Sequence, residues 1–60
     1  MDTNEMIKKA YQDECASTLL YTTMAEVEKD PRLAEVYQRI ARTEKHHAEK
    51  WAQRAKEAGI

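Results

Sequence analysis

A single break near the middle of the chain, at Lys29-Asp30-Pro31, is the feature that most constrains how these 60 residues can fold. Proline disfavours a helical conformation in the residue before it, yet it fits the first position of a helix, where its missing N–H is no loss. The only glycine, Gly59, lies near the end of the sequence and is suited to cap a helix there. Most other residues are good helix formers. The sequence therefore predicts an all-α fold of two helices that meet at Asp30.

Capping residues also mark the first helix. Asp2 and Glu5 match a capping box, in which side-chain oxygens accept hydrogen bonds from the free amides of the first turn. We expect this helix to begin at Asp2 or Thr3 and to end near Glu28. Because the connection is short, the two helices should lie antiparallel, so that residues 1–60 form one domain, a single helical hairpin.

Each predicted helix carries a stripe of residues spaced by three and four positions, which share one helical face. The first stripe consists of Ile7, Ala10, Tyr11, Glu14, Thr18, Tyr21, Met24 and Ala25, and the second of Leu33, Val36, Tyr37, Ile40, Ala41, Glu44, His47, Ala48, Trp51 and Ala55. One partner helix cannot cover a stripe this broad. Two hairpins that dimerise into a four-helix bundle would cover both stripes.

The size of the chain supports the same conclusion. A chain of 60 residues buries only about 60% of its unfolded surface when it folds alone. Cys15 is the only cysteine, so no disulfide within the chain can add stability. We therefore expect a homodimer, open to higher assembly, together with or in place of a bound metal.

Several classes of function are disfavoured by the distribution of charge and apolar residues. The formal net charge is −1, and the basic residues are scattered among acidic ones, whereas a nucleic-acid-binding protein would show a basic stripe. No run of about 18 apolar residues predicts a membrane span, and no charged leader followed by an apolar stretch predicts secretion. The lone thiol agrees with a cytoplasmic location.

Three ionisable residues, Glu14, Glu44 and His47, lie where the stripes call for apolar residues. Burying an ionised carboxylate without a partner costs several kcal/mol. Glu14 lies 16 residues before Asp30, and Glu44 and His47 lie 14 and 17 residues after it. At about 1.5 Å per residue these positions are about 24, 21 and 26 Å from the turn. All three side chains should therefore lie at one level, near the middle of antiparallel helices.

In a dimer, a two-fold axis near that level would gather four glutamates and two histidines. This is the ligand set of ferritin-like di-iron or di-manganese bundles, in which two helices each contribute a Glu and the other two each contribute Glu-x-x-His. Carboxylates bridge and neutralise two divalent ions, and imidazole adds a nitrogen ligand. The expected cofactor is two iron ions per dimer, with manganese or zinc as alternatives. Glu14, Glu44 and His47 are the predicted metal ligands.

A second interpretation of the same residues stays open. Glu14 or Glu44 could extend to the edge of the bundle, and His47 could be an interface residue whose hydrogen bonds are satisfied. The chain would then be a structural or interaction module, a dimer of helical hairpins that is metal-free or holds a metal without redox chemistry.

Two segments resemble the rubrerythrins. Residues 14–25 resemble the first rubrerythrin helix, with Glu14, then Tyr21, then Ala25, and residues 37–51 resemble the second, with its Ala-x-x-Glu-x-x-His-Ala pattern from Ala41 to Ala48. The Asp30-Pro31-Arg32 turn and Trp51 look closest to the rubrerythrin-like domains that precede some membrane proteins of the vacuolar-iron-transporter type. The resemblance covers most of residues 10 to 55.

The resemblance implies a ferritin-like di-iron protein. Glu14, Glu44 and His47 match the iron ligands of the family, and Tyr21 matches a tyrosine that donates a hydrogen bond to a ligand carboxylate. The implied activity is that of a ferroxidase, or of an oxidoreductase that reduces O2 or H2O2. The chain departs from the family in holding two helices instead of four and in lacking a Cys-x-x-Cys rubredoxin-type iron site, and a homodimer would restore the four helices.

Four residues beside the predicted ligands have simpler interpretations. His46 should point about 100° away from His47, into solvent. Trp51, one turn past His47, could close the apolar shell of the site. Cys15 is expected to be a small interface residue, and Thr18 should either donate a hydrogen bond to a carboxylate or pack.

Overall fold

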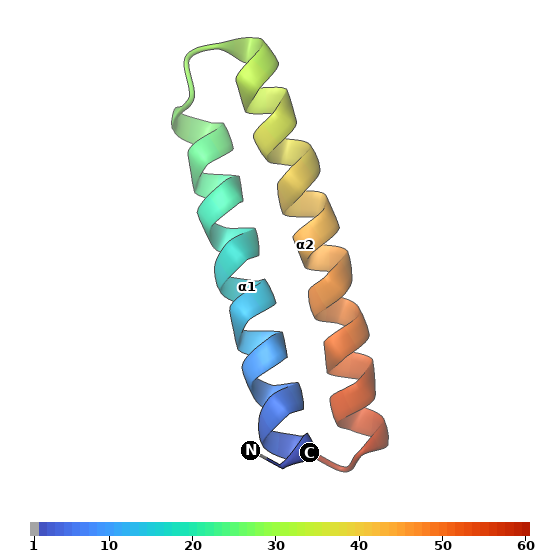
Figure 1. The fold of residues 1–60 in the computed structure, drawn as a ribbon. Coiled ribbons are helices and arrows are strands. Elements are labelled where there is room, and N and C mark those ends of the chain that lie inside the picture. The colour runs from blue at the N-terminus through green and yellow to red at the C-terminus, as the bar shows by residue number, and fades with distance from the viewer. Residues whose placement is uncertain (1) are drawn as a thin grey trace.

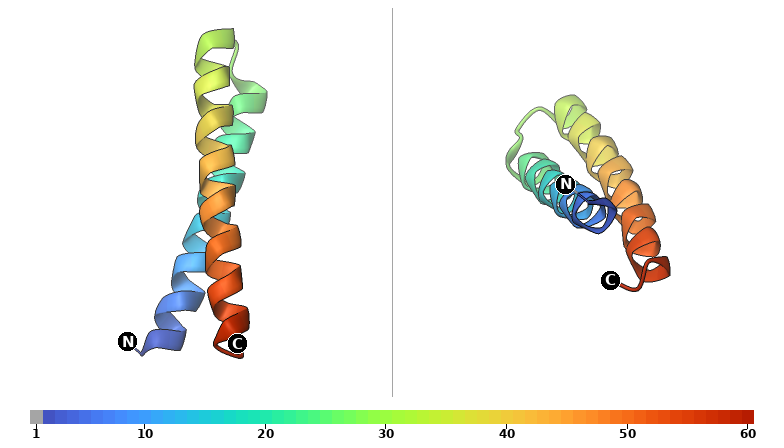
Figure 2. Two further views of the ribbon diagram at one scale, coloured as in Figure 1. Left: turned by 90° about the vertical axis from the view of Figure 1, so that its right-hand side faces the viewer. Right: turned by 60° about the horizontal axis from the view of Figure 1, so that its bottom comes forward.

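The computed structural model describes residues 2–60 and contains two helices, α1 (Thr3–Val27) and α2 (Pro31–Glu57). They run antiparallel and are joined by one short connection, so that the N- and C-terminal ends lie together at the far end of the hairpin (Figure 1). The hairpin is long and flat, with extents of 42 × 17 × 11 Å. In the view turned by 90° the two helices cross at a shallow angle, and their free ends lie apart (Figure 2). The predicted all-α hairpin is confirmed.

Helix α1 begins where its capping residue predicts. A side-chain oxygen of Asp2 accepts a hydrogen bond of 2.8 Å from the backbone N–H of Glu5, which satisfies one of the free amides of the first turn. The helix ends at Val27, and Glu28 follows in an extended conformation. The expected end near Glu28 is therefore correct to within one residue.

Helix α2 is capped at both ends. The side chain of Asp30 accepts a hydrogen bond of 2.9 Å from the backbone N–H of Arg32, and Pro31 occupies the first helical position. At the other end Gly59 adopts a φ of 75°, which favours glycine. Backbone hydrogen bonds from Gly59 to Lys56 (3.2 Å) and from Ile60 to Ala55 (2.9 Å) complete a Schellman motif.

The core of the hairpin is small. Within residues 2–60, only Ile7, Ala41 and Ala48 are buried. The two alanines let α1 approach α2 closely, and nearer the turn the rings of Tyr21 and Tyr37 lie 6.2 Å apart between the helices. The large apolar side chains that stay exposed are Met6, Tyr11, Leu19, Leu20, Val27, Leu33, Val36 and Ile60. The hairpin by itself therefore buries few apolar side chains, and the dimer that would cover the exposed ones stays a prediction.

Membrane insertion by a helix is not supported along the described residues. Neither α1 nor α2 contains a stretch that is both long enough and apolar enough to cross a lipid bilayer.

Candidate metal centre

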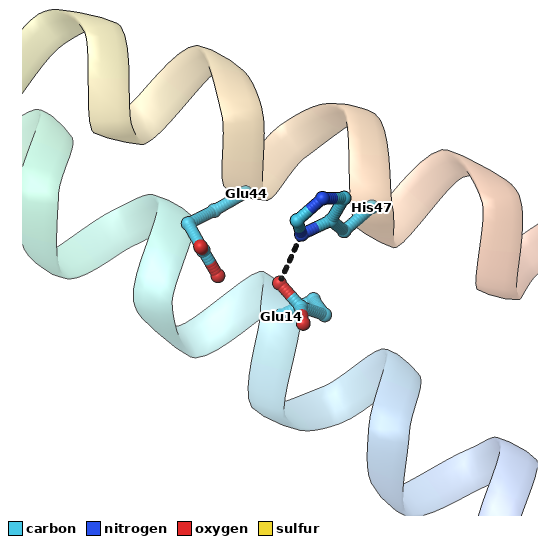
Figure 3. A group of neighbouring side chains, drawn as sticks. All are labelled: Glu14, Glu44 and His47. Atoms are coloured by element: carbon cyan, nitrogen blue, oxygen red, sulfur yellow. Dashed lines mark ion pairs between the residues drawn. The ribbon is translucent and has the colours of Figure 1, made fainter.

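The three residues predicted as ligands meet at one place in the hairpin. Glu14 reaches from α1, and Glu44 and His47 reach from adjacent turns of α2 (Figure 3). One ligand atom from each side chain lies within 4.8 Å of the other two. The structure thus brings together all three residues at the common level that their distances from Asp30 predict.

The local sequence of α2 explains why the side chains converge. Ala41 and Ala48, both buried, lie three residues before and four residues after Glu44, on the same helical face. Because alanine has a short side chain, the two helices approach closely on either side of Glu44 and leave room for longer side chains between them. Glu14 projects into this room from the opposite helix and is partly buried.

The Glu14 carboxylate is partly buried without the hydrogen bonds that would stabilise it. Its Oε2 atom is buried and has no hydrogen-bond partner among the described residues. The Nδ1 atom of His47 lies 3.6 Å from Glu14 Oε2, and the side chains of His47 and Glu14 are 47% and 24% exposed, respectively. A buried carboxylate oxygen without a hydrogen bond is destabilising, so the site lacks a positive group or a donor.

Repulsion between the carboxyl groups of Glu14 and Glu44 destabilises the metal-free site further. The pKa of Glu44 is raised above its ordinary value, chiefly by the hydrogen bond that it can share with the Glu14 carboxyl when one of the two is protonated. Partial burial and the negative charge of Glu14 raise this pKa further, and His47 opposes the shift. Two carboxyl groups that resist joint ionisation at short range are typical of a site that a cation stabilises.

The donor set fits a transition-metal ion. Two carboxylates and one imidazole are the ligand types of non-haem iron, manganese and zinc. Two donor atoms each about 2.1 Å from one ion lie roughly 3 to 4 Å apart, and the 3.6 Å between His47 Nδ1 and Glu14 Oε2 falls in this range. A bound cation would also satisfy the buried Glu14 oxygen. Three donors from one hairpin leave a site for two ions incomplete.

Tyr21 and Thr18, which lie near the candidate ligands, each carry a hydroxyl group that was expected to interact with the site. The ring of Tyr21 packs against Tyr37 between the helices, and the hydrogen bond predicted from its hydroxyl to a ligand carboxylate stays a prediction. The hydroxyl of Thr18 donates to the backbone carbonyl of Glu14 at 2.8 Å. Of the two expectations for Thr18, donation to a carboxylate is therefore wrong, and packing is compatible with its partly buried side chain.

The other expected neighbours are placed as follows. His46 is exposed, as predicted, and Trp51 is half-buried with the guanidinium carbon of Arg54 4.7 Å from its ring centroid.

Sequence reasoning missed the pairing of Tyr11 with Cys15. A hydrogen bond between their side chains raises the pKa of Tyr11, and their spacing of four positions on one helix is the signal that predicts such a contact.

The fold and the site together define a class, that of helical carboxylate–histidine proteins suited to bind transition metals between antiparallel helices. The model of the rubrerythrin family matches residues 5–59. The chain therefore belongs to the rubrerythrin family, and membership implies iron binding. The closer likeness to domains of vacuolar-iron-transporter-type proteins stays a prediction. Comparison with curated proteins and with solved structures gave no match.

Proposed function

We propose that this chain supplies half of a dinuclear iron site, completed when two copies associate, and acts as a ferroxidase or as a reductase of O2 or H2O2. The observation that carries the proposal is the buried Oε2 atom of Glu14, which has no hydrogen-bond partner within residues 2–60 and lies beside Glu44 and His47. Burial of such an oxygen is costly unless a bound cation offsets the cost. Family membership makes iron the expected ion.

The exposed surface supports association of two hairpins. The hairpin exposes 4709 Å², whereas a folded protein of this mass exposes about 4000 Å². The difference of about 700 Å² is close to the roughly 800 Å² that each partner buries in a standard interface. Leu33 and Val36 are exposed and lie on the side of α2 that carries His47. An interface on this side would cover them and bring two sets of ligands together.

Each ligand has a definite role in this arrangement. Glu14 and Glu44 would hold the ions through their carboxylates, and His47 would add a ring nitrogen as a terminal ligand. Binding requires that Glu44 release its proton and that His47 be neutral. The hydroxyl of Tyr21 would donate a hydrogen bond that orients a ligand carboxylate. The ring of Tyr21, packed on Tyr37, would keep water from the turn side of the site.

Iron bound at these residues would supply reversible oxidation and coordination positions open to O2 or H2O2. As a ferroxidase, the protein would take Fe(II) as substrate and electron donor, with O2 or H2O2 as the acceptor. As a peroxidase, it would need an external reductant to return the electrons. Both activities agree with the cytoplasmic location that the free Cys15 thiol suggests.

A second candidate function is a dimeric helical module without redox chemistry. The contact between His47 and Glu14 favours it, because a protonated His47 would partly neutralise the carboxylate without any metal. In this case the hairpin would dimerise through its apolar side chains alone. Zinc or manganese held at the same ligands would likewise give binding without oxidation.

Anaerobic loading with Fe(II) followed by exposure to air distinguishes these functions. The di-iron proposal predicts a dimer with about one iron per chain, and Fe(II) oxidation faster than in buffer. Loading with Zn(II) is the matched control, since it should fill the site and block oxidation. A dimer that takes up no iron would support the structural module, and iron uptake with oxidation no faster than in buffer would support binding alone.

A further inference from the structure

The three candidate ligands converge within a single chain, before any partner is added. Glu14 extends from α1 toward α2, and Glu44 and His47 extend from α2 toward α1 (Figure 3). One ligand atom of each side chain lies within 4.8 Å of the other two. Three protein ligands and a water molecule are enough to hold a zinc ion in many enzymes. One hairpin therefore contains a sufficient set of donors for one ion.

The direction of the Glu14 side chain favours ligands from the same chain over ligands from a partner. Its Oε2 atom is buried and faces Nδ1 of His47 at 3.6 Å (Figure 3). The buried residues Ala41 and Ala48 let the two helices approach closely on either side of Glu44. To reach a histidine of a second chain, Glu14 would have to turn out of this space and lose the contact with its own His47.

The half-exposed imidazole of His47 leaves one side of the site open to solvent. Its side chain is 47% exposed, whereas that of Glu14 is 24% exposed, so an ion can enter beside His47 without separating the helices. Val36, which is exposed and apolar, lies eleven residues before His47, or about three turns along the same side of α2. A partner seated on this side would cover the opening.

We propose that each hairpin holds one ion with its own Glu14, Glu44 and His47, and that this ion binds before a second copy associates. This order of assembly rests on the proposed dinuclear function. Two metal-free hairpins would bring four carboxyl groups together without a cation, and like charges in contact oppose association. With an ion in each hairpin the repulsion is offset, and the partner then covers both openings.

Two mixtures with the same number of ligand residues test whether the ligands of one ion come from one chain. The first contains equal amounts of Glu14→Gln and His47→Ala chains. The second contains equal amounts of wild-type chain and of the double variant with both changes. The chains of each mixture are unfolded, refolded together and loaded with Zn(II), and bound zinc is measured after gel filtration. We expect the second mixture to bind half as much zinc as the wild type, and the first to bind about tenfold less than the second.

The outcome of the mixing experiment separates this inference from the proposed function. Equal zinc in the two mixtures would show that Glu14 of one chain completes the site of the other. The inference would then be wrong, and a metal site at the dimer interface would stand. A wild-type protein that takes up neither zinc nor iron would overturn both.

The order of binding is tested by the solution mass and by a variant that weakens association. At one protein concentration, the wild type should be a dimer with Zn(II) and a single hairpin without it. Val36→Lys should stay a single hairpin, bind one Zn(II) per chain and release it to a chelator about tenfold faster than the wild type, because its site stays open.

Gln38→Lys is the matched control, since Gln38 is exposed and lies about 200° around the helix from Val36. It should associate and retain zinc as the wild type does. A metal-free wild type that is as fully dimeric as the loaded protein would overturn the proposed order. A single hairpin of Val36→Lys, or of diluted wild type, that binds no zinc would overturn it as well.

Discussion

The imidazole of His47 lies across the helix pair from Glu14, with Nδ1 3.6 Å from the buried Oε2 atom. This separation is too long for an ordinary hydrogen bond, although both atoms belong to groups that seek one. The two side chains are therefore close enough to share a cation and too far apart to satisfy one another. The proposed iron binding at these residues depends on this relationship, and substitutions of the residues around it should have different effects on iron binding and on stability.

Removal of the His47 imidazole should lower the iron content without unfolding the hairpin. His47 is half-exposed, so His47→Ala removes a ligand and little packing. We expect the iron content, measured after gel filtration in the presence of a weak chelator, to fall at least tenfold. His46→Ala is the control, because His46 is adjacent and exposed, and it should retain wild-type iron. Equal losses in the two variants would remove His47 from the ligand set.

Neutralising Glu14 should have opposite effects on stability and on metal binding. Glu14→Gln removes the charge repulsion with Glu44 and adds an amide that can donate to it. We expect the metal-free protein to gain about 1 kcal/mol in free energy of unfolding and to lose iron binding. Asp13→Asn is the control, since Asp13 is exposed and forms a surface ion pair with Lys9 at 3.1 Å, and the change should be within about 0.5 kcal/mol. A destabilised Glu14→Gln variant would contradict the assignment of an unsatisfied carboxylate.

The raised pKa of Glu44 predicts opposite pH dependence with and without metal. Because folding raises this pKa, Glu44 contributes stability below the ordinary glutamate pKa, and the contribution is lost as the pH rises through the raised value. In the metal-free protein this contribution to the melting temperature should therefore decline as the pH rises above the ordinary glutamate pKa of about 4.3. With iron, the ionised carboxylate and neutral His47 are required, so the melting temperature should rise over the same range.

Glu44→Gln tests whether this residue causes the effect. The variant should flatten the pH dependence of the metal-free protein and should not be stabilised by iron. A metal-free wild type whose pH dependence matches that of Glu44→Gln would show that the two carboxyl groups do not interact.

The hydroxyl of Tyr21 should matter for iron binding, whereas that of Tyr37 should not. Phenylalanine at either position keeps the ring contact of 6.2 Å between the two side chains. Loss of a hydrogen bond to a ligand typically weakens metal binding 10- to 100-fold. We expect a loss of this size in Tyr21→Phe and none in Tyr37→Phe, measured by competition with a chelator. Similar affinities in both variants would leave Tyr21 with a packing role alone.

Local features of the fold were predictable from the sequence because they depend on neighbours in the chain. The caps at Asp2 and Asp30 each involve residues two or three positions away. The common level of Glu14, Glu44 and His47 follows from counting residues from one turn, because both helices rise by the same amount per residue. The distances between these side chains required the structure, since they depend on how closely the helices approach at Ala41 and Ala48.

Other features of the site were not predictable in this way. The hydroxyl of Thr18 can bond either a side chain or a backbone carbonyl, and only the geometry of the turn decides between them. The exposure of Leu19 could not be predicted by a search for one apolar stripe, since Leu19 lies outside that stripe and is nevertheless apolar. Association between chains depends on the shape of the exposed surface and on concentration, and the residue pattern of one chain describes these only in part.

The two ends of the chain lie at the same end of the hairpin, opposite the Asp30 connection (Figure 1). A mechanical force applied between them would therefore open the helix pair like a zipper and would not stretch it lengthwise. The contacts of Ile7 would break first, those of Ala48 next, and those of Ala41, closest to the connection among these three, last. The candidate ligands lie part of the way along this path, so tension on the ends would separate Glu14 from His47 while the turn is still intact.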